Sequence, residues 1–476
     1  MNVPSYAFLA FGVLVAILIN ISQRSAWRRG VWLIANLACV ASFTLAPLSL
    51  IPFGSFLLFG FVSIKVVEHW RNRAAFWTIL VLLVGAFCWL KRYTFIPPGA
   101  LLPFGYFMVG MSYVSFRIVH LIIDAYQDSL PEAIGIINYI NYTLNFPSLI
   151  AGPIQLYPDY LRSQRGTVLD DAAALRAIER IIVGFFKVAI VSPLLLTLHQ
   201  KTLSEAITSA AVGERAVFAA LMLAVYPVYI YINFSGYMDT VIGIARFLRL
   251  ELPENFNRPF VSRGFIELWG RWHMTLSNWI KTYIYSPLFI GLMHRFPKPS
   301  AQPILGVVAY FVAFFFVGVW HGQTASFIFI GVMFGLGVSV NKLYQILMLR
   351  QFGRLQYHAI CERSIYKAFS RALTFSWFAL SSLWFWATWP QLHQIALELG
   401  APGAALATML LLFGAAPALA LLDAMQNWSA REARSQSPLP WSPYVRIVWY
   451  TALATLVVSA TAILNAPAPH VIYKAF

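Results

Sequence analysis

Apolar segments alternate with short polar connections along the entire chain. They begin with residues 1–22 and recur at about 31–50, 53–67, 75–90, 103–125, 133–152, 174–198, 214–233, 237–250, 303–320, 325–341, 372–388, 403–422 and 445–464. A helix needs roughly 20 apolar residues to cross a bilayer, and several segments approach that length. Proline interrupts others, which is typical of kinked or re-entrant helices buried in protein. The pattern predicts an all-α, polytopic integral membrane protein with roughly 11–13 transmembrane or re-entrant helices around a central tunnel.

The longest uncharged stretch runs from Pro299 to Asn341 and contains no Asp, Glu, Lys or Arg. His321 is its only residue that titrates near neutral pH. A histidine between two apolar segments is costly unless it is hydrogen-bonded or lines a wet cavity. Gly322, which follows it, permits a close approach of other groups to the backbone. The alternative is an interfacial histidine that caps the end of a helix.

A second stretch, from Glu251 to about Pro299, mixes polar and aromatic residues. It is too polar to face lipid and too aromatic for an ordinary solvent loop, which favours short interfacial or re-entrant helices. His273 lies within it, and we expect these helices to bring His273 near His321. Two histidines in one polar pocket suit acid–base chemistry, in which one deprotonates a hydroxyl and the other orients it or stabilises charge.

Other polar residues within apolar segments have simpler interpretations. His120 and Asp124 are four residues apart, so they can pair on one helix face, and a structural pair is the expectation. Asp239 precedes an apolar run, and we expect it to cap a helix there.

Composition agrees with a membrane protein, because 59% of the 476 residues are hydrophobic and only 11% are charged. Apolar segments leave no room for a separate soluble domain, so residues 1–476 are expected to form a single membrane domain. The net charge of +16 is attributed to cytoplasmic loops rather than to nucleic-acid binding. The three cysteines form no short-spaced pair, and neither an H-E-x-x-H motif nor an acidic cluster indicates a metal site.

Basic residues give the expected orientation. Three clusters mark cytoplasmic loops: Arg24, Arg28 and Arg29; Lys65, Arg71 and Arg73; and Lys342 with the basic residues that follow it. The first segment lacks a basic region before it, so it is interpreted as a retained helix with its N-terminus outside. Lys91 and Arg92 fall on the opposite side, which suggests that one early segment is re-entrant.

Several motifs, taken in order, identify a resemblance to a known family. They are Gly110-Met-Ser-Tyr-Val-Ser-Phe116, Phe146-Pro-Ser-Leu-Ile-Ala-Gly-Pro-Ile154, Asn233-Phe-Ser-Gly-Tyr-Met-Asp239, Pro253-Glu-Asn-Phe-Asn-Arg-Pro-Phe260, Arg271-Trp-His-Met-Thr-Leu-Ser277, Val319-Trp-His-Gly322 and Trp384-Phe-Trp-Ala387. Over residues 100–390 the chain resembles the membrane-bound O-acyltransferase (MBOAT) family, in particular its alginate O-acetyltransferase and D-alanyl-lipoteichoic-acid transferase branches.

The resemblance implies the fold, the reaction and the site. It makes His321 the family's catalytic histidine and His273 its second polar position, so both are the expected catalytic residues. The matching motifs and their surroundings give the expected substrate-binding residues: Asn255, Asn257, Arg271, Ser277, Lys281, Trp320 and Gly322. One departure is Lys281-Thr282, where these branches usually carry an Arg-Asp pair; Lys keeps the charge but not the bidentate geometry of Arg.

The implied reaction transfers an acyl group, with acetyl expected, from a cytoplasmic thioester such as acetyl-CoA or an acyl carrier protein. The acceptor is a hydroxyl of an envelope polysaccharide or of a periplasmic or membrane-anchored relay partner. No tightly bound cofactor is expected, and the location is the bacterial inner membrane. The alternatives are D-alanyl transfer toward teichoic acid, a transporter, and a non-catalytic scaffold of an export complex.

Overall fold

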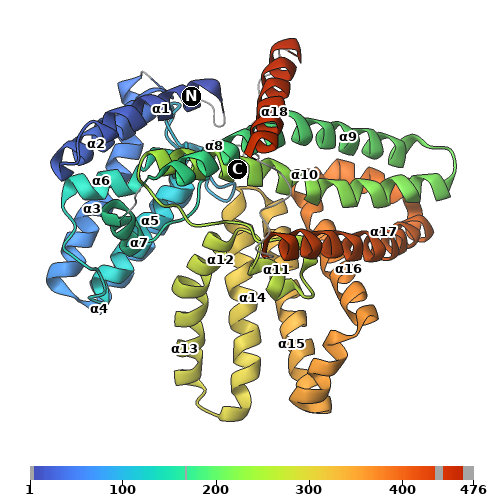
Figure 1. Ribbon diagram of the computed structural model, residues 1–476. Coiled ribbons are helices and arrows are strands. Elements are labelled where there is room, and N and C mark those ends of the chain that lie inside the picture. Colours follow the sequence, from blue (N-terminus) through green and yellow to red (C-terminus); the bar gives the residue numbers. More distant parts are fainter. Residues whose placement is uncertain (1–4, 45, 167–168, 435–442, 465–476) are drawn as a thin grey trace.

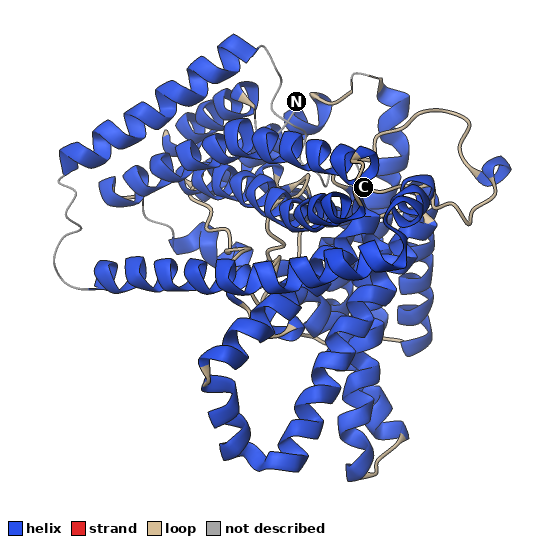
Figure 2. Ribbon diagram, turned by 90° about the vertical axis from the view of Figure 1, so that its right-hand side faces the viewer, coloured by secondary structure: helices blue, strands red, loops and turns tan. Residues whose placement is uncertain are grey.

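The computed structural model describes residues 5–44, 46–166, 169–434 and 443–464. These residues form helices joined by short connections, and no strand is present among them (Figure 2). The α-helices are α1 (Tyr6–Asn20), α2 (Ser25–Ala41), α3 (Pro47–Trp70), α4 (Arg73–Leu90), α5 (Met111–Tyr126), α6 (Ile136–Thr143), α7 (Tyr157–Gly166), α8 (Asp171–Phe186), α9 (Ser192–Thr208), α10 (Val212–Phe247), α11 (Phe265–Trp269), α12 (Met274–Ile280), α13 (Ser286–Arg295), α14 (Gln302–His321), α15 (Ala325–Glu362), α16 (Ser364–Ser381), α17 (Trp389–Arg434) and α18 (Pro443–Leu464). The predicted all-α, polytopic fold is confirmed.

Among the described residues, eight helical stretches are long and apolar enough to cross a membrane. Other apolar segments form shorter elements than their lengths suggest. The segment 133–152 contains only α6 and a 3-10 turn at Phe146–Ser148, because Pro147 cannot continue a helix. The stretch that begins at Glu251 folds into the short helices α11, α12 and α13, with a π-helical turn at Lys281–Tyr285.

The two apolar segments predicted at 214–233 and 237–250 are joined in the structure, because residues 212–247 form the single helix α10. Gly236 does not end the helix, because it serves close packing instead. A Cβ atom there would lie 2.9 Å from the backbone oxygen of Gly184 on α8. Asp239 therefore lies inside α10, and the expectation that it caps a helix is wrong. It pairs with Arg180 at 2.9 Å and with Lys187 at 2.7 Å.

The helices α14 and α15 lie side by side and, with α13, extend away from the rest of the molecule (Figure 1). Proline in its first turn suits the start of α14. The helix ends at His321, because Gly322 adopts an extended conformation with φ −165° and ψ 177°. Residue 324 then precedes α15, so the turn between the two helices is very short. Their close approach fixes where His321 lies.

We predict that Gly318→Ala destabilises this helix pair. A Cβ atom at Gly318 would lie 2.1 Å from the backbone nitrogen of Gly331, so the two backbones must separate. Overpacking of this kind costs about 1–3 kcal/mol. Thermal unfolding of the purified protein measures the effect. Gly85→Ala on α4 is the control, because a Cβ atom there meets nothing within 4 Å. Equal melting temperatures for the two variants would refute the close-packing role.

Candidate active site

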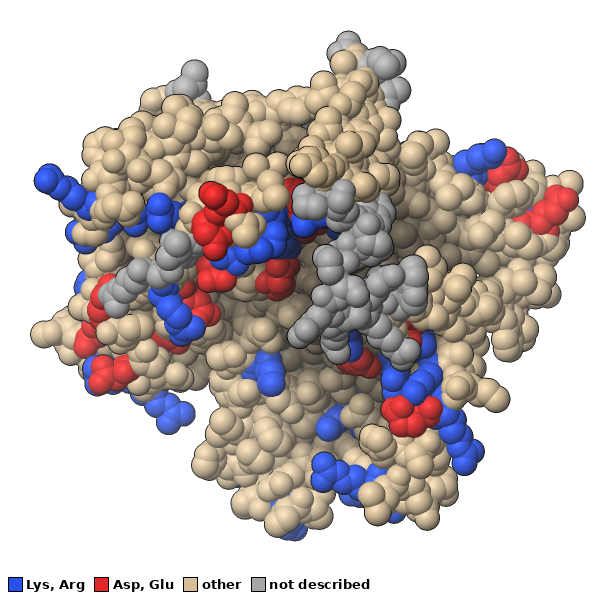
Figure 3. Space-filling view, in the orientation of Figure 1, with Lys and Arg blue, Asp and Glu red and all other residues tan. Residues whose placement is uncertain are grey.

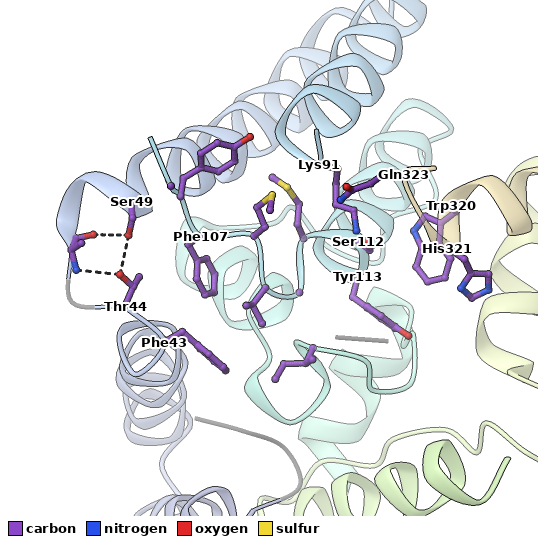
Figure 4. Close-up of a pocket in the computed structure, with 18 residues that line it drawn as sticks. Phe43, Thr44, Ser49, Lys91, Phe107, Ser112, Tyr113, Trp320, His321 and Gln323 are labelled. Atoms are coloured by element: carbon purple, nitrogen blue, oxygen red, sulfur yellow. Dashed lines mark hydrogen bonds between the residues drawn. The ribbon is translucent and has the colours of Figure 1, made fainter. Parts of the chain in front are cut away.

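A cavity of about 730 Å³ lies where α14 ends (Figure 4). His321, Trp320 and Gln323 line it on one side, together with Tyr113 of α5. Lys91, just beyond the end of α4, also lines it. The cavity thus collects side chains from helices that are far apart in the sequence.

His321 is buried, with 2% of its surface exposed. Its ring makes edge-to-face contacts with Trp320 at 4.8 Å and with Phe385 at 5.3 Å between ring centroids. It ends α14 in sequence, but it lies in an aromatic wall rather than in solvent. This setting disagrees with the alternative of an exposed interfacial capping histidine.

His273 is fully buried at the start of α12. The Oδ1 atom of Asn255 accepts hydrogen bonds from the backbone N–H of Thr275 at 3.1 Å and from its hydroxyl at 2.8 Å. Because that oxygen can only accept, the Nδ1 atom of His273, 3.2 Å away, must carry the proton. The Nε2 atom is left as an acceptor and faces the hydroxyl of Tyr113 at 3.5 Å. Asn255 therefore sets both the tautomer and the direction of this imidazole.

Tyr113 connects the two histidines. Its ring packs edge-to-face on Trp320, the neighbour of His321, at 5.8 Å between centroids, while its hydroxyl faces His273. Burial, and to a smaller extent nearby His321, lower the pKa of His273 well below its usual value. Both histidines thus belong to one buried cluster beside the cavity.

The other expected site residues lie in different places. Trp320 is on the cavity wall, and its indole N–H has no hydrogen-bond partner among the described residues. Gly322 allows tight packing, because a Cβ atom there would lie 2.0 Å from the ring of Phe327. The backbone N–H of Asn257 donates to the carbonyl of Arg271 at 2.9 Å, and the guanidinium of Arg271 donates to the carbonyl of Asn257 at 3.3 Å.

Arg271 also pairs with Glu267 at 3.0 Å. Ser277 contacts the carbonyl of Trp272 at 3.4 Å, and Lys281 is exposed on the π-helical turn. None of Asn257, Arg271, Ser277 and Lys281 lines the cavity that holds His321. Their roles in substrate binding stay predictions.

The described part of the chain contains no group of three or more His, Cys, Asp or Glu side chains that could hold a metal ion. His120 and Asp124 form the expected pair, 3.0 Å apart. Tyr142 and Tyr283 complete a buried polar cluster around that pair.

Comparison with known proteins places these features in a family. The family of membrane-bound O-acyltransferases matches residues 107–362, more than half of the chain, and this range includes both histidines. The chain belongs to the MBOAT family. The match confirms the resemblance carried by the motifs and lies within the expected core at 100–390.

Similar proteins include members of two MBOAT branches. The teichoic acid D-alanyltransferase of Bacillus subtilis (strain 168) is 28% identical over 239 residues, which is 50% of this chain and 58% of that protein. The probable alginate O-acetylase AlgI of Pseudomonas aeruginosa is 28% identical over 236 residues, 49% of this chain and 42% of that protein. The teichoic acid D-alanyltransferase of Lacticaseibacillus rhamnosus is 26% identical over 311 residues, 63% and 74% of the two chains. The chain spans about half the length of the first two relatives.

Two of the cavity residues that sequence reasoning missed in this MBOAT protein are Tyr113 and Lys91. Tyr113 lies within the motif at 110–116, but nothing in that motif shows that its hydroxyl faces His273. Lys91 was used only for orientation. Its position directly after an apolar helix, on the side opposite the arginine-rich loops, is the signal that could have singled it out.

We predict that burial of His273 makes the fold sensitive to acid. Its pKa is lower in the folded than in the unfolded chain, so the unfolded state binds more protons. Stability from this residue is therefore complete above about pH 6.5, the pKa of a free imidazole, and is lost as pH falls below it. The melting temperature of the wild type should fall more between about pH 7.5 and pH 5.5 than that of His273→Asn.

Asparagine suits this position because the backbone of His273 has a positive φ of 44°. The exposed His294 provides a control, His294→Asn, which should follow the wild type at both pH values. An identical fall in all three proteins would contradict the prediction.

Proposed function

We propose that this MBOAT protein is an O-acyltransferase that moves an acyl group from a thioester to a hydroxyl. The observation that carries the proposal is a buried histidine, His321, on the wall of a cavity, with His273 fixed beside it by Asn255. The family description adds the reaction class. Neither a nucleophilic serine nor a metal site is needed for this chemistry.

His321 would act as the general base. As the acceptor oxygen attacks the thioester carbon, the imidazole takes the hydroxyl proton, so that a C–O bond forms. The C–S bond then breaks, and the proton passes to the sulfur, which leaves as a thiol. A buried donor such as the unpaired indole N–H of Trp320 is the kind of group that stabilises the transient oxyanion. The apolar surroundings exclude water, which would otherwise hydrolyse the thioester.

His273 would support this step rather than perform it. Its Nε2 atom accepts from the direction of Tyr113, whose ring packs against Trp320. This series of side-chain contacts, from Asn255 through His273 to Tyr113, therefore orients Trp320 and its neighbour His321 on the cavity wall. A positioning role of this kind needs an imidazole that stays neutral, which its low pKa provides.

The acyl group is proposed to be acetyl, with acetyl-CoA or an acyl carrier protein as donor. The acceptor is proposed to be a hydroxyl of an envelope polysaccharide or a relay protein. The similarity to alginate O-acetylases supports this choice. D-alanyl transfer is the second candidate, supported by similarity of the same degree to teichoic acid D-alanyltransferases. Family membership favours acyl transfer over the transporter alternative.

We further propose that the protein lies in the bacterial inner membrane, with the cavity opening outward. Ser49, near the start of α3, and Lys91, just after α4, line the cavity, so Arg71 and Arg73 lie at the far ends of these helices. Basic residues also follow the far ends of α13 and α15, and Figure 3 shows positive charge spread over that part of the molecule. The positive-inside rule assigns these ends to the cytoplasm and the N-terminus to the outside. Lys91 and Arg92 then lie outside after a complete helix α4, and no re-entrant segment is required.

A cytoplasmic donor and an external acceptor require a path that opens on both faces, which is the expected tunnel. Such a path by itself discriminates poorly between hydroxyl positions on similar sugars. We propose that a periplasmic or membrane-anchored partner over the outer mouth chooses the position.

We predict that His321→Ala abolishes transfer while the protein still folds, because the variant loses the base but no charged pair. The acyl content of envelope polymers would be measured by mass spectrometry in cells that express the variant or the wild type at equal levels. His294→Ala removes an exposed histidine and should leave the acyl content unchanged. Full acylation by His321→Ala would disprove the catalytic role. Acyl groups absent even with the wild type would favour the scaffold alternative, and their mass otherwise separates acetyl from D-alanyl.

We predict that the purified protein in lipid acylates polysaccharide slowly or at mixed positions, and that the partner restores rate and position. The experiment compares reconstituted vesicles with acetyl-CoA and polymer, with and without a candidate periplasmic or membrane-anchored partner. NMR of the product reports the acylated position. Full rate and a single position without the partner would exclude the partner hypothesis.

A further inference from the structure

The cavity is lined by two parts of the chain of different origin. Tyr113, Trp320, His321 and Gln323 come from the region that matches the MBOAT family. Four further lining residues precede residue 107, where the family match begins: Phe43, Thr44 and Ser49 lie across the cavity from His321, whereas Lys91 lies beside Gln323 (Figure 4). The residues that carry the chemistry thus share the cavity with a surface that lies outside the matched region. Such a surface is where the choice of substrate can be made without changing the reaction.

Lys91 is the charged residue on that surface. It is 4% exposed, and its side chain points into the cavity beside Gln323 and Ser112 (Figure 4). The segment that follows it is fixed to the last turn of α14 and to the connection between α14 and α15. The hydroxyl of Tyr93 donates to the carbonyl of Val319 at 3.2 Å, and that of Thr94 donates to the carbonyl of Gln323 at 2.8 Å. These bonds hold Lys91 at a constant place relative to His321.

Among the described residues, no partner compensates the ammonium group. The cavity is lined by no acidic residue, and in the described part of the chain no carboxylate forms an ion pair with Lys91. Burial lowers the pKa of Lys91 to about 8, so the group is mostly charged at neutral pH. A buried charge without a partner is costly, and an anion that enters the cavity would recover part of that cost.

We propose that Lys91 binds an oxyanion, a carboxylate or a phosphate, of an acidic glycan acceptor, and thereby directs a nearby hydroxyl toward His321. This inference rests on the proposed acyl transfer and on the outward opening of the cavity. An ammonium group is a strong donor to either anion, and such charge-assisted bonds are the strongest hydrogen bonds available to it. Thr44, Ser49 and Ser112 add hydroxyl groups to the cavity lining, Ser112 directly beside Lys91 (Figure 4), which suits the hydroxyl groups of a sugar.

Direct binding tests the site without any turnover. The full-length protein, in nanodiscs of zwitterionic lipid, is titrated calorimetrically with an oligouronate, with the same oligosaccharide after reduction of its carboxyl groups, and with an oligo(glycerol phosphate). The wild type should bind at least one of the two anionic probes roughly tenfold more tightly than the neutral one. Lys91→Met should lose that difference while keeping its affinity for the neutral probe, and Lys91→Arg should retain most of it.

Two controls accompany the titration. Lys201→Met removes an exposed lysine on α9 and should bind like the wild type. Lys91→Met keeps the aliphatic stem and removes a buried charge, so its melting temperature should not fall. Unchanged preference for anionic probes in Lys91→Met would overturn the proposal. So would loss of probe binding when anionic lipid is added to the nanodiscs, because the site would then belong to a lipid headgroup.

Transfer assays separate this inference from the proposed function. With a thioester donor, Lys91→Met should raise the KM for the acidic acceptor and leave kcat nearly unchanged. An equal loss of kcat on acidic and neutral acceptors, with binding intact, would show that Lys91 acts on the transition state and would overturn the binding role. If the wild type binds acidic probes through Lys91 but transfers no acyl group either to them or to a relay protein, the proposed function fails while the binding site stands.

Discussion

The arrangement of the site depends on the cost of placing polar groups in surroundings that offer them little water. His273 is fully buried, and the amide oxygen of Asn255 meets the part of this cost that falls on its Nδ1 atom. The Oδ1 atom of Asn255 accepts two hydrogen bonds from Thr275, which fix that oxygen in place. The Nδ1–H group of His273 then points at the same oxygen. The neutral tautomer follows from this geometry, and so does the direction of the second nitrogen. Removing the amide would leave a buried donor unsatisfied, which costs more than the hydrogen bond itself contributes.

The same constraint explains why small residues, rather than polar ones, bring the long helices together. Between α14 and α15, Gly318 and Gly331 let the two backbones approach each other, and a single Cβ atom would prevent that approach. Membrane helices gain little from burying apolar surface against each other, because lipid is equally apolar, so close packing must provide the attraction. His321 follows this contact by three residues. The position of the base is therefore set by a packing contact that involves no polar group.

The sequence predicted the elements whose signals are local. The uncharged run around His321 and the polar–aromatic stretch around His273 both pointed to buried, unusual positions, and the motif order identified the family. What could not be predicted depends on contacts between distant segments. Gly236 lies between two predicted segments and suggests a helix break, yet α10 continues through it. The glycine is needed there because the backbone of α8 packs closely against that of α10. Asp239 is likewise explained by Arg180 and Lys187, which lie more than 50 residues away in the chain.

The role of Lys91 could not be predicted from the sequence, because it depends on where the fold places this residue. In the sequence it is one basic residue beside an apolar segment, and a loop charge is the ordinary interpretation. In the fold, Tyr93 bonds to Val319 just before His321 and Thr94 bonds to Gln323 just after it, so that Lys91 is carried into the cavity and away from solvent. A base for deprotonating hydroxyl groups has little selectivity of its own, because the hydroxyl groups of different glycans have similar acidity. A fixed cation in the same cavity discriminates by charge, which differs greatly between neutral and acidic polymers. The chemistry and the choice of polymer can therefore reside on different residues of one cavity, supplied by different parts of the chain.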